Sequence, residues 1–349
     1  MRIVYHLPND DLVKARDTAK AAELAGFDGV VALENAHGPF PPLSVAALST
    51  QKIQLGTGVA IAFPRSPTIM AHAAWDLHKA SLGRFHLGIG SQVRGHNERR
   101  YGVAWTAPAP RMRDYIGAVR ALWDAWETGE PINYQSEHYA LTLTTPNFSP
   151  KPMGLSRIPI SIAALGPGMT RVAGDVADGI RLHPFHTRRY VAERCLTELQ
   201  VGLDRSGRAR SDIEVIAGAF LATGPDSATV ERMLEYIRFR IAFYCSTRAY
   251  WHVLRLHGLE ALGEHLRDFP AQGRWSEMAA QIPDDIVSLF AMVGTYDEIP
   301  EQLEARYGGL IDTVDLYVPP GTDPASLSQV VDAAHHLGDH GNEARPTHG

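Results

Sequence analysis

Cysteines, clustered basic residues and long apolar runs are all scarce in this sequence. Cys195 and Cys245 lie far apart and form no Cys-x-x-Cys pair, so we expect neither a disulfide framework nor a zinc site. A formal net charge of −6 without a basic stripe argues against nucleic acid as a partner. No signal peptide or stretch of about 18 apolar residues is present. We therefore expect a cytoplasmic protein with no membrane partner.

Short apolar strands and amphipathic helices alternate along most of the chain. Between Lys52 and Val93, two strands that each end in Gly-x-Gly flank one helix, which is typical of a βαβ unit. Strands are predicted at Ile3–Leu7, Gly29–Leu33, Ile53–Val59, Phe85–Ile89, Pro159–Ala163, Gly179–Leu182, Ile213–Ala222 and Thr313–Val318. Helices are predicted at Leu12–Ala25, Pro41–Ser49, Pro67–Ser81, Ala109–Trp126, Gly168–Val176, Arg188–Arg205, Ala228–Ile241, Glu298–Tyr307 and Pro324–Leu337.

Eight such strands joined by right-handed crossovers favour an α/β fold of the (β/α)8 TIM-barrel type. A doubly wound open sheet is the alternative, but the first strand is not followed by its Gly-x-Gly-x-x-Gly fingerprint. The alternation of strands and helices stops at residues 243–289, which are rich in aromatic residues and are predicted to be helical. We predict one domain over residues 1–340, with 243–289 inserted after the seventh strand as a lid. Residues 341–349 are expected to form a flexible tail, at the end of a polar stretch that begins at His335.

The active site of such a barrel lies where the strands end. The predicted strand ends carry His6, Glu34, Asn35, His37, Gly58, Val59, Phe63, Ser91, Gln92, Ala163, Ala164, Gly166 and His183. Glu34 is the single carboxylate in this set, so a metal cage or a two-carboxylate hydrolase is not expected. An apolar, glycine-lined opening with several histidines is typical of a site for a flat cofactor that carries the chemistry itself.

Four segments together resemble the bacterial-luciferase-like flavin and deazaflavin oxidoreductase superfamily, in particular its coenzyme F420-dependent branch. They are the segment from Ala19 to Val30, Leu55-Gly-Thr-Gly-Val, Arg84-Phe-His-Leu-Gly-Ile-Gly-Ser, and Ile160-Ser-Ile-Ala-Ala-Leu-Gly-Pro with Ala173-Gly-Asp-Val-Ala-Asp-Gly. The resemblance covers almost the whole chain.

The resemblance implies a non-prolyl cis peptide at Gly58–Val59 that supports the cofactor ring from behind. It implies F420, or alternatively FMN, bound by Glu34, Gly58, Val59, Ser91, Gln92, Ala163, Ala164 and Gly166. The lid would shape a substrate pocket that includes Phe63, His183 and Trp251. A homodimer is the expected assembly.

Sugar-phosphate dehydrogenases of this branch carry a histidine at the end of strand two and a glutamate after strand four. Here Asn35 and Val93 occupy those places, which argues against a sugar-phosphate substrate. We expect hydride transfer between F420 and an organic, apolar small molecule, with His6, Asn35 or His37 handling the proton. An FMN-dependent monooxygenase and a non-catalytic flavin-binding barrel are the alternatives.

Overall fold

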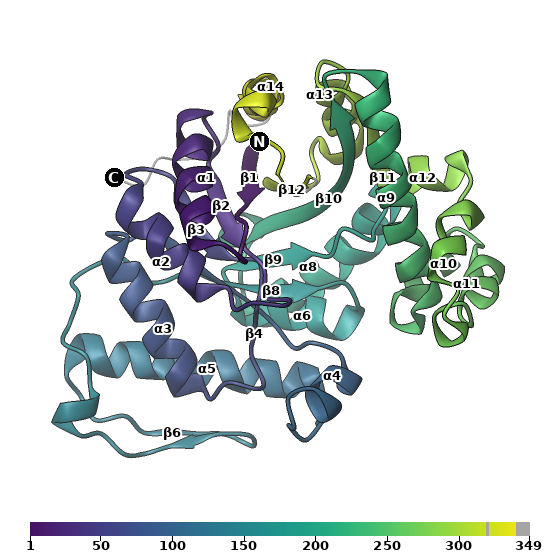
Figure 1. Ribbon diagram of the computed structural model, residues 1–349. Helices are drawn as coiled ribbons and strands as arrows, with labels where there is room; N and C mark the ends of the chain where they lie inside the picture. The colour runs from purple at the N-terminus through teal and green to yellow at the C-terminus, as the bar shows by residue number, and fades with distance from the viewer. Residues whose placement is uncertain (319–320, 340–349) are drawn as a thin grey trace.

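Eight parallel strands close into a barrel in the computed structural model, which describes residues 1–318 and 321–339 (Figure 1). The strands are β1 (Arg2–His6), β2 (Gly29–Ala32), β3 (Gln54–Thr57), β5 (Phe85–Gly90), β8 (Ile160–Ala164), β9 (Gly179–Leu182), β10 (Glu214–Gly224) and β12 (Thr313–Tyr317). Pairing of Gly179 with Glu214 joins β9 to β10 and closes the ring. The predicted (β/α)8 TIM barrel is therefore confirmed.

Helices surround the barrel and bury their apolar faces against it. They are α1 (Leu12–Leu24), α2 (Phe40–Ser49), α3 (Pro67–Ala80), α5 (Pro108–Thr128), α6 (Pro167–Val176), α7 (Arg188–Tyr190), α8 (Leu196–Ser206), α9 (Ser227–Ser246), α13 (Ile299–Tyr307) and α14 (Ser328–Asp339). Side-chain caps fix several starts, since Asp11, Ser66 and Asp226 each accept a hydrogen bond from a main-chain N–H of the first turn. The helix predicted at Arg188–Arg205 is interrupted by a π-helical segment, Val191–Cys195.

The predicted lid region is largely helical. It comprises the end of α9, then α10 (Trp251–Leu256), α11 (Glu260–Leu266) and most of α12 (Asp284–Phe290), which Figure 1 shows grouped beside α9. A strand that we did not predict follows, β11 (Ala291–Thr295), and it pairs with Phe220–Gly224 of β10. The long strand β10 therefore extends past the barrel and anchors the insertion to it.

Smaller elements complete the chain. A two-residue strand, β4 (Ala60–Ile61), and a short helix, α4 (Arg94–Arg99), follow β3 and β5, and an antiparallel hairpin pairs β6 (Tyr134–Gln135) with β7 (Ala140–Leu141). The predicted flexible tail, 341–349, lies outside the described residues. His335 does not begin a tail, because it belongs to α14 and its Nε2 lies 2.9 Å from Asp28 Oδ2.

Polar side chains occupy much of the barrel interior, where bulky aliphatic layers are usual. Arg2 pairs with Glu214 near the amino ends of the strands, and Arg181 with Asp315 further along. Glycines make the room: a Cβ on Gly88 would lie 2.0 Å from the Thr57 carbonyl oxygen and 3.0 Å from Arg181 Nε. The Arg181 side chain thus fills space that glycine leaves open, and the barrel supports a charged floor beneath its mouth.

Candidate active site at the barrel mouth

A cradle of small side chains lies between the ends of β3, β5 and β8. The peptide bond between Gly58 and Val59 is cis, which confirms that prediction. A Cβ on Gly90 would lie 2.8 Å from Val59 Cγ2 and 3.4 Å from the Ala163 Cβ. Val59, Gly90 and Ala163 therefore meet in one surface that has no room for a larger residue at position 90. Such a surface suits a flat ring laid against it.

Glu34 stabilises the backbone next to this cradle. Its Oε2 accepts hydrogen bonds from the Ile61 N–H at 2.7 Å and from Arg65 Nη1 at 2.8 Å. Arg65 also donates to the Ile61 carbonyl at 2.9 Å. The Glu34 carboxylate, which we predicted to bind the cofactor, is thus hydrogen-bonded to β4 and to Arg65. It would affect ligand binding by fixing the backbone that follows Val59.

Asn35 and His37 lie exposed on the loop after β2. Asn35 Oδ1 accepts from Asn9 Nδ2 at 2.9 Å and from the Ala36 N–H, and the Asn35 carbonyl accepts from Arg100 Nη2 at 2.6 Å. The side chain of Asn35 therefore organises its own loop. His37 accepts the Asn35 N–H through its carbonyl at 3.3 Å, and its ring is open to solvent.

Ser91 and Gln92 form a rigid turn after β5. Gln92 has φ = 55°, in the left-handed region that non-glycine residues seldom adopt, and its Oε1 accepts the Val93 N–H at 2.9 Å. The buried Asn97 of α4 donates to the carbonyls of Ser91 and Val93 at 2.9 and 3.1 Å. These bonds fix the turn beside the cradle without using the Ser91 hydroxyl.

Ala163 and Ala164 end β8, and Gly166 caps the start of α6. A Cβ on Gly166 would have no neighbour within 4 Å, so the backbone is accessible there. The α6 N-terminus, with its free N–H groups, offers an anion a favourable dipole. Beside it lies a groove of about 400 Å³ whose lining includes Arg194, His252 and Arg255.

His6, Asp315 and Arg181 form a charged cluster below the mouth. His6 Nε2 lies 2.5 Å from Asp315 Oδ1, and Arg181 Nη1 donates to Asp315 Oδ2 at 3.0 Å. The His6 ring also packs against Tyr317, with centroids 4.3 Å apart. Burial raises the pKa of Asp315, but the attraction and hydrogen bond of His6 and the charge of Arg181 outweigh it and hold that pKa below its ordinary value. Asp315 is therefore ionised at neutral pH and orients His6.

His183 faces an aromatic wall built by the insertion. Its ring centroid lies 4.4 Å from that of Tyr244 and 4.8 Å from that of Tyr250. The Phe185 N–H donates to His183 Nδ1 at 3.1 Å, so the neutral ring carries its proton on Nε2. Burial and the charge of Arg240 lower the pKa of His183 to about 3, so the ring stays neutral across the physiological range.

Phe63 and Trp251, the other predicted pocket residues, are both buried. The Arg111 guanidinium lies 4.4 Å above the Phe63 ring. Trp251 donates from Nε1 to the Cys245 carbonyl at 2.8 Å, and its indole packs so closely on Gly263 that a Cβ there would lie 2.8 Å from Nε1. The indole thus packs α10 against α11 inside the insertion.

Asp315, Arg181, Tyr244 and Tyr250 escaped the sequence reasoning. A usable signal existed for two of them, because Asp315 and Arg181 are charged residues in the middle of apolar strands, where a charge requires a partner. The tyrosines carry no such signal, since their direction depends on how α9 and the insertion fold back over the barrel.

Comparisons with known proteins show the family and the fold. The family model described as luciferase-like monooxygenase matches residues 3–313. An uncharacterised protein of Mycobacterium tuberculosis is 42% identical over 308 residues, covering 88% of this chain and 90% of that protein. The 5,10-methylenetetrahydromethanopterin reductase of Archaeoglobus fulgidus is 27% identical over 315 residues, covering 89% and 91%.

Among solved structures, the coenzyme F420-dependent tetrahydromethanopterin reductase of Methanopyrus kandleri superposes with a TM-score of 0.81 at 20% identity, covering 96% of this chain and 99% of that one. This likeness independently supports the barrel fold. Together with the family match over most of the chain, it leads to one conclusion. The chain belongs to the luciferase-like monooxygenase family.

Proposed function

We propose that the protein is an F420-dependent oxidoreductase that moves a hydride to or from an organic, apolar small molecule. The observation that carries the proposal is the cradle of Val59, Gly90 and Ala163 at the mouth of the barrel whose interior holds the His6–Asp315 pair. A ring face and a proton-handling group are thereby offered at one opening. The archaeal reductases among the relatives support F420 as the cofactor.

The cradle and the turns around it would hold the cofactor. Val59 and Ala163 would support the ring, with Gly58, Gly90 and Ala164 keeping the backbone close. Ser91, Gln92 and the Gly166 amide would contact the chain that leads to the phosphate. Arg194 and Arg255 would meet an acidic tail in the groove beside α6, where the lining carboxylate Glu198 pairs with Arg171. This favours F420 over FMN, which ends in one phosphate.

A bound deazaflavin supplies the hydride chemistry itself. Asp315 orients His6, whose Nδ1 has no hydrogen-bond partner in the described part of the chain and would be the atom that gives or takes the proton. His183 stays neutral and offers its Nε2–H to a polar atom of the substrate, while Tyr244, Tyr250 and Phe63 exclude water from the reacting atoms. Asn35 and His37 act by shaping the loop at the rim, and Trp251 acts by holding α10 in place.

Equilibrium binding of F420 and FMN to the purified protein tests this proposal. Tight F420 binding without FMN binding is expected. Preference for FMN would favour the alternative hypothesis of an FMN-dependent monooxygenase, which agrees with the description of the family. Tight binding without turnover of any reducible substrate would leave a non-catalytic flavin-binding barrel.

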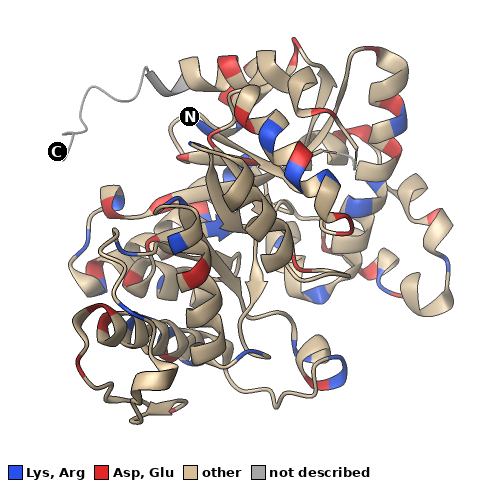
Figure 2. Cartoon of the chain, turned by 60° about the vertical axis from the view of Figure 1, so that its left-hand side comes forward, with Lys and Arg blue, Asp and Glu red and all other residues tan. Residues whose placement is uncertain are grey.

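The expected assembly is a homodimer in the cytoplasm, with no nucleic acid or membrane partner. Figure 2 shows acidic and basic residues interspersed over the helices, and not gathered by sign. In the part of the chain that the structure describes, no helix combines the length and hydrophobicity that crossing a bilayer requires.

A further inference from the structure

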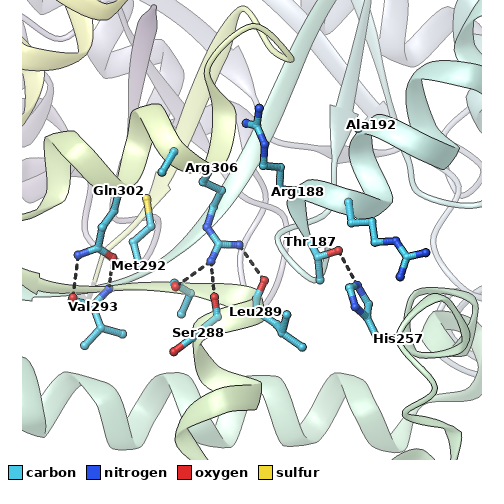
Figure 3. A pocket seen from close by; sticks show the side chains of 13 residues that line it. Thr187, Arg188, Ala192, His257, Ser288, Leu289, Met292, Val293, Gln302 and Arg306 are labelled. Atoms are coloured by element: carbon cyan, nitrogen blue, oxygen red, sulfur yellow. Dashed lines mark hydrogen bonds between the residues drawn. The ribbon is translucent and has the colours of Figure 1, made fainter.

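A further cavity is lined by residues that lie outside the eight barrel strands. It has a volume of about 810 Å³ and runs between the α7 and π-helical region on one side and α13 on the other, over the end of α12 and the edge of β11 (Figure 3). Its lining comprises Thr187, Arg188, Arg189, Ala192, His257, Ser288, Leu289, Ala291, Met292, Val293, Gln302, Ala305 and Arg306. This volume lies in the range of sites for small organic ligands. We call it the α7–α13 groove.

Arg306 brings a positive charge to this groove without a carboxylate partner among the described residues. It is half-buried, and its guanidinium donates to the carbonyls of Leu289 and Ser288 at 2.8 Å each and of Ala291 at 2.9 Å. Three of its five N–H groups are thus used, and all three bond to carbonyl oxygens at the end of α12. A guanidinium with free N–H groups and no carboxylate partner favours an anion.

Arg188 adds a second charge that the described residues leave without a counter-ion. Both of its Nη atoms lie 3.4 Å from the Gly308 carbonyl, which is long for a hydrogen bond. Arg189 is different, because its Nε donates to Glu193 at 2.9 Å. No aspartate or glutamate lines the groove. Two arginines without a carboxylate partner among the described residues therefore line one cavity.

The rest of the lining limits what could bind. Gln302 donates to the Val293 carbonyl at 2.8 Å and accepts the Val293 N–H at 3.0 Å, so it already covers the free edge of β11. An extended peptide therefore cannot pair with that edge. Leu289, Met292 and Ala192 make the remaining wall apolar. The chemistry calls for a compact ligand with an anionic group at one end and an apolar body.

We propose that the α7–α13 groove binds a small organic anion, with Arg188 and Arg306 on its charged group and Leu289, Met292 and Ala192 against its apolar part. The site is separate from the proposed cofactor site and does not depend on that proposal. Figure 3 shows Arg306 and Leu289 on one side of the groove and Thr187 and His257 on the other. Thr187 Oγ1 and His257 Nε2 lie 2.8 Å apart.

Hydrogen–deuterium exchange of the full chain, with and without phenyl phosphate, tests the proposal. Peptides covering residues 288–306, none of which lines the groove beside α6, should be protected by phenyl phosphate and not by benzyl alcohol, the neutral probe of similar shape. Arg188→Gln should weaken the apparent affinity roughly tenfold, the usual effect of losing one charge-assisted hydrogen bond. Ala192→Trp, at an exposed position, should abolish protection by filling the groove.

Arg16→Gln is the matched control, since Arg16 is an arginine of α1 that pairs with Asp17, and it should leave the protection unchanged. Protection only around the barrel mouth would overturn the proposal. So would equal protection by benzyl alcohol, or an undiminished response in both Arg188→Gln and Ala192→Trp. Because the readout is local to the groove, these outcomes are independent of F420 binding.

Discussion

Asp315 lies between a histidine and an arginine inside the barrel, and its removal leaves Arg181 without a counter-charge. Asp315→Asn keeps the size of the side chain and removes its charge. We expect it to lower the free energy of unfolding by about 3–5 kcal/mol, because the Arg181 charge would remain buried without its counter-ion. Urea unfolding at pH 7 measures this, with Asp17→Asn, an exposed aspartate, as a control that should not move the midpoint.

The same pair predicts a pH dependence. Since the folded-state pKa of Asp315 is depressed, its contribution to stability is present above the ordinary carboxyl pKa of about 4 and is lost as the pH falls through the folded value. The gap in stability between the natural protein and Asp315→Asn should therefore narrow as the pH falls from 5 towards 3. A gap that stays constant down to pH 3 would contradict the assignment.

Gly90 is the residue on which the cradle depends most directly. In Gly90→Ala the new Cβ would lie 2.8 Å from Val59 Cγ2, so Val59 must move. We expect a stability loss of about 1–3 kcal/mol, as for other overpacked sites, and F420 binding weakened by at least roughly tenfold. Gly38→Ala is the control, since its Cβ would meet nothing within 4 Å. Unchanged F420 affinity in Gly90→Ala would remove the cradle from the binding site.

At the scale of elements, Glu34 connects the end of β2 to β4. Glu34→Ala should destabilise the fold by about 1–3 kcal/mol, because the Ile61 N–H loses its acceptor and Arg65 loses its counter-charge. Glu34→Gln retains an acceptor for Ile61 and should recover part of that loss. Thermal denaturation and F420 titration of both variants would separate backbone support from direct ligand contact. Normal stability with lost binding in Glu34→Ala would favour direct contact.

The order of strands and helices could be predicted from the sequence, because the spacing of apolar residues and the capping residues mark each element locally. It missed β11, because Ala291–Thr295 follows the apolar end of α12 without a turn signal and becomes a strand only by pairing with β10. It also missed the partnership of Asp315 with Arg181, which joins residues far apart in sequence. The loops after β3 and β5 could be located from the spacing of their glycines. The positions of Tyr244 and Tyr250 beside His183 depend on tertiary packing and could not be predicted.

Arg84 illustrates how a motif residue can serve the fold and not the site. It belongs to the segment that resembles the fourth strand of the family, yet its guanidinium bonds to the carbonyls of Ala47, Thr50 and Ile53 and its Nε to that of Ser81. These bonds hold the ends of α2 and α3 side by side. Arg84 therefore organises the outer surface of the molecule on this side.

For the whole molecule, this surface is the one we expect to form the homodimer. Leu48 and Leu82, next to the carbonyls that Arg84 holds, are 78% and 81% exposed. Large apolar side chains gathered on neighbouring helices mark an interface more often than a free surface. Burial against a second copy would remove this area from water and stabilise the pair.

Light scattering after gel filtration tests the interface. The natural protein should elute as a dimer, and the double variant Leu48→Lys, Leu82→Lys as a monomer, since two charges would have to be buried without partners on each side. Leu143→Lys is the matched control, because Leu143 is 83% exposed but lies after the β6–β7 hairpin. If all three proteins are dimers, the contact lies elsewhere, and if the natural protein is a monomer, the expected homodimer is wrong. If the control also dissociates, the effect comes from added charge and the α2–α3 face is not the interface.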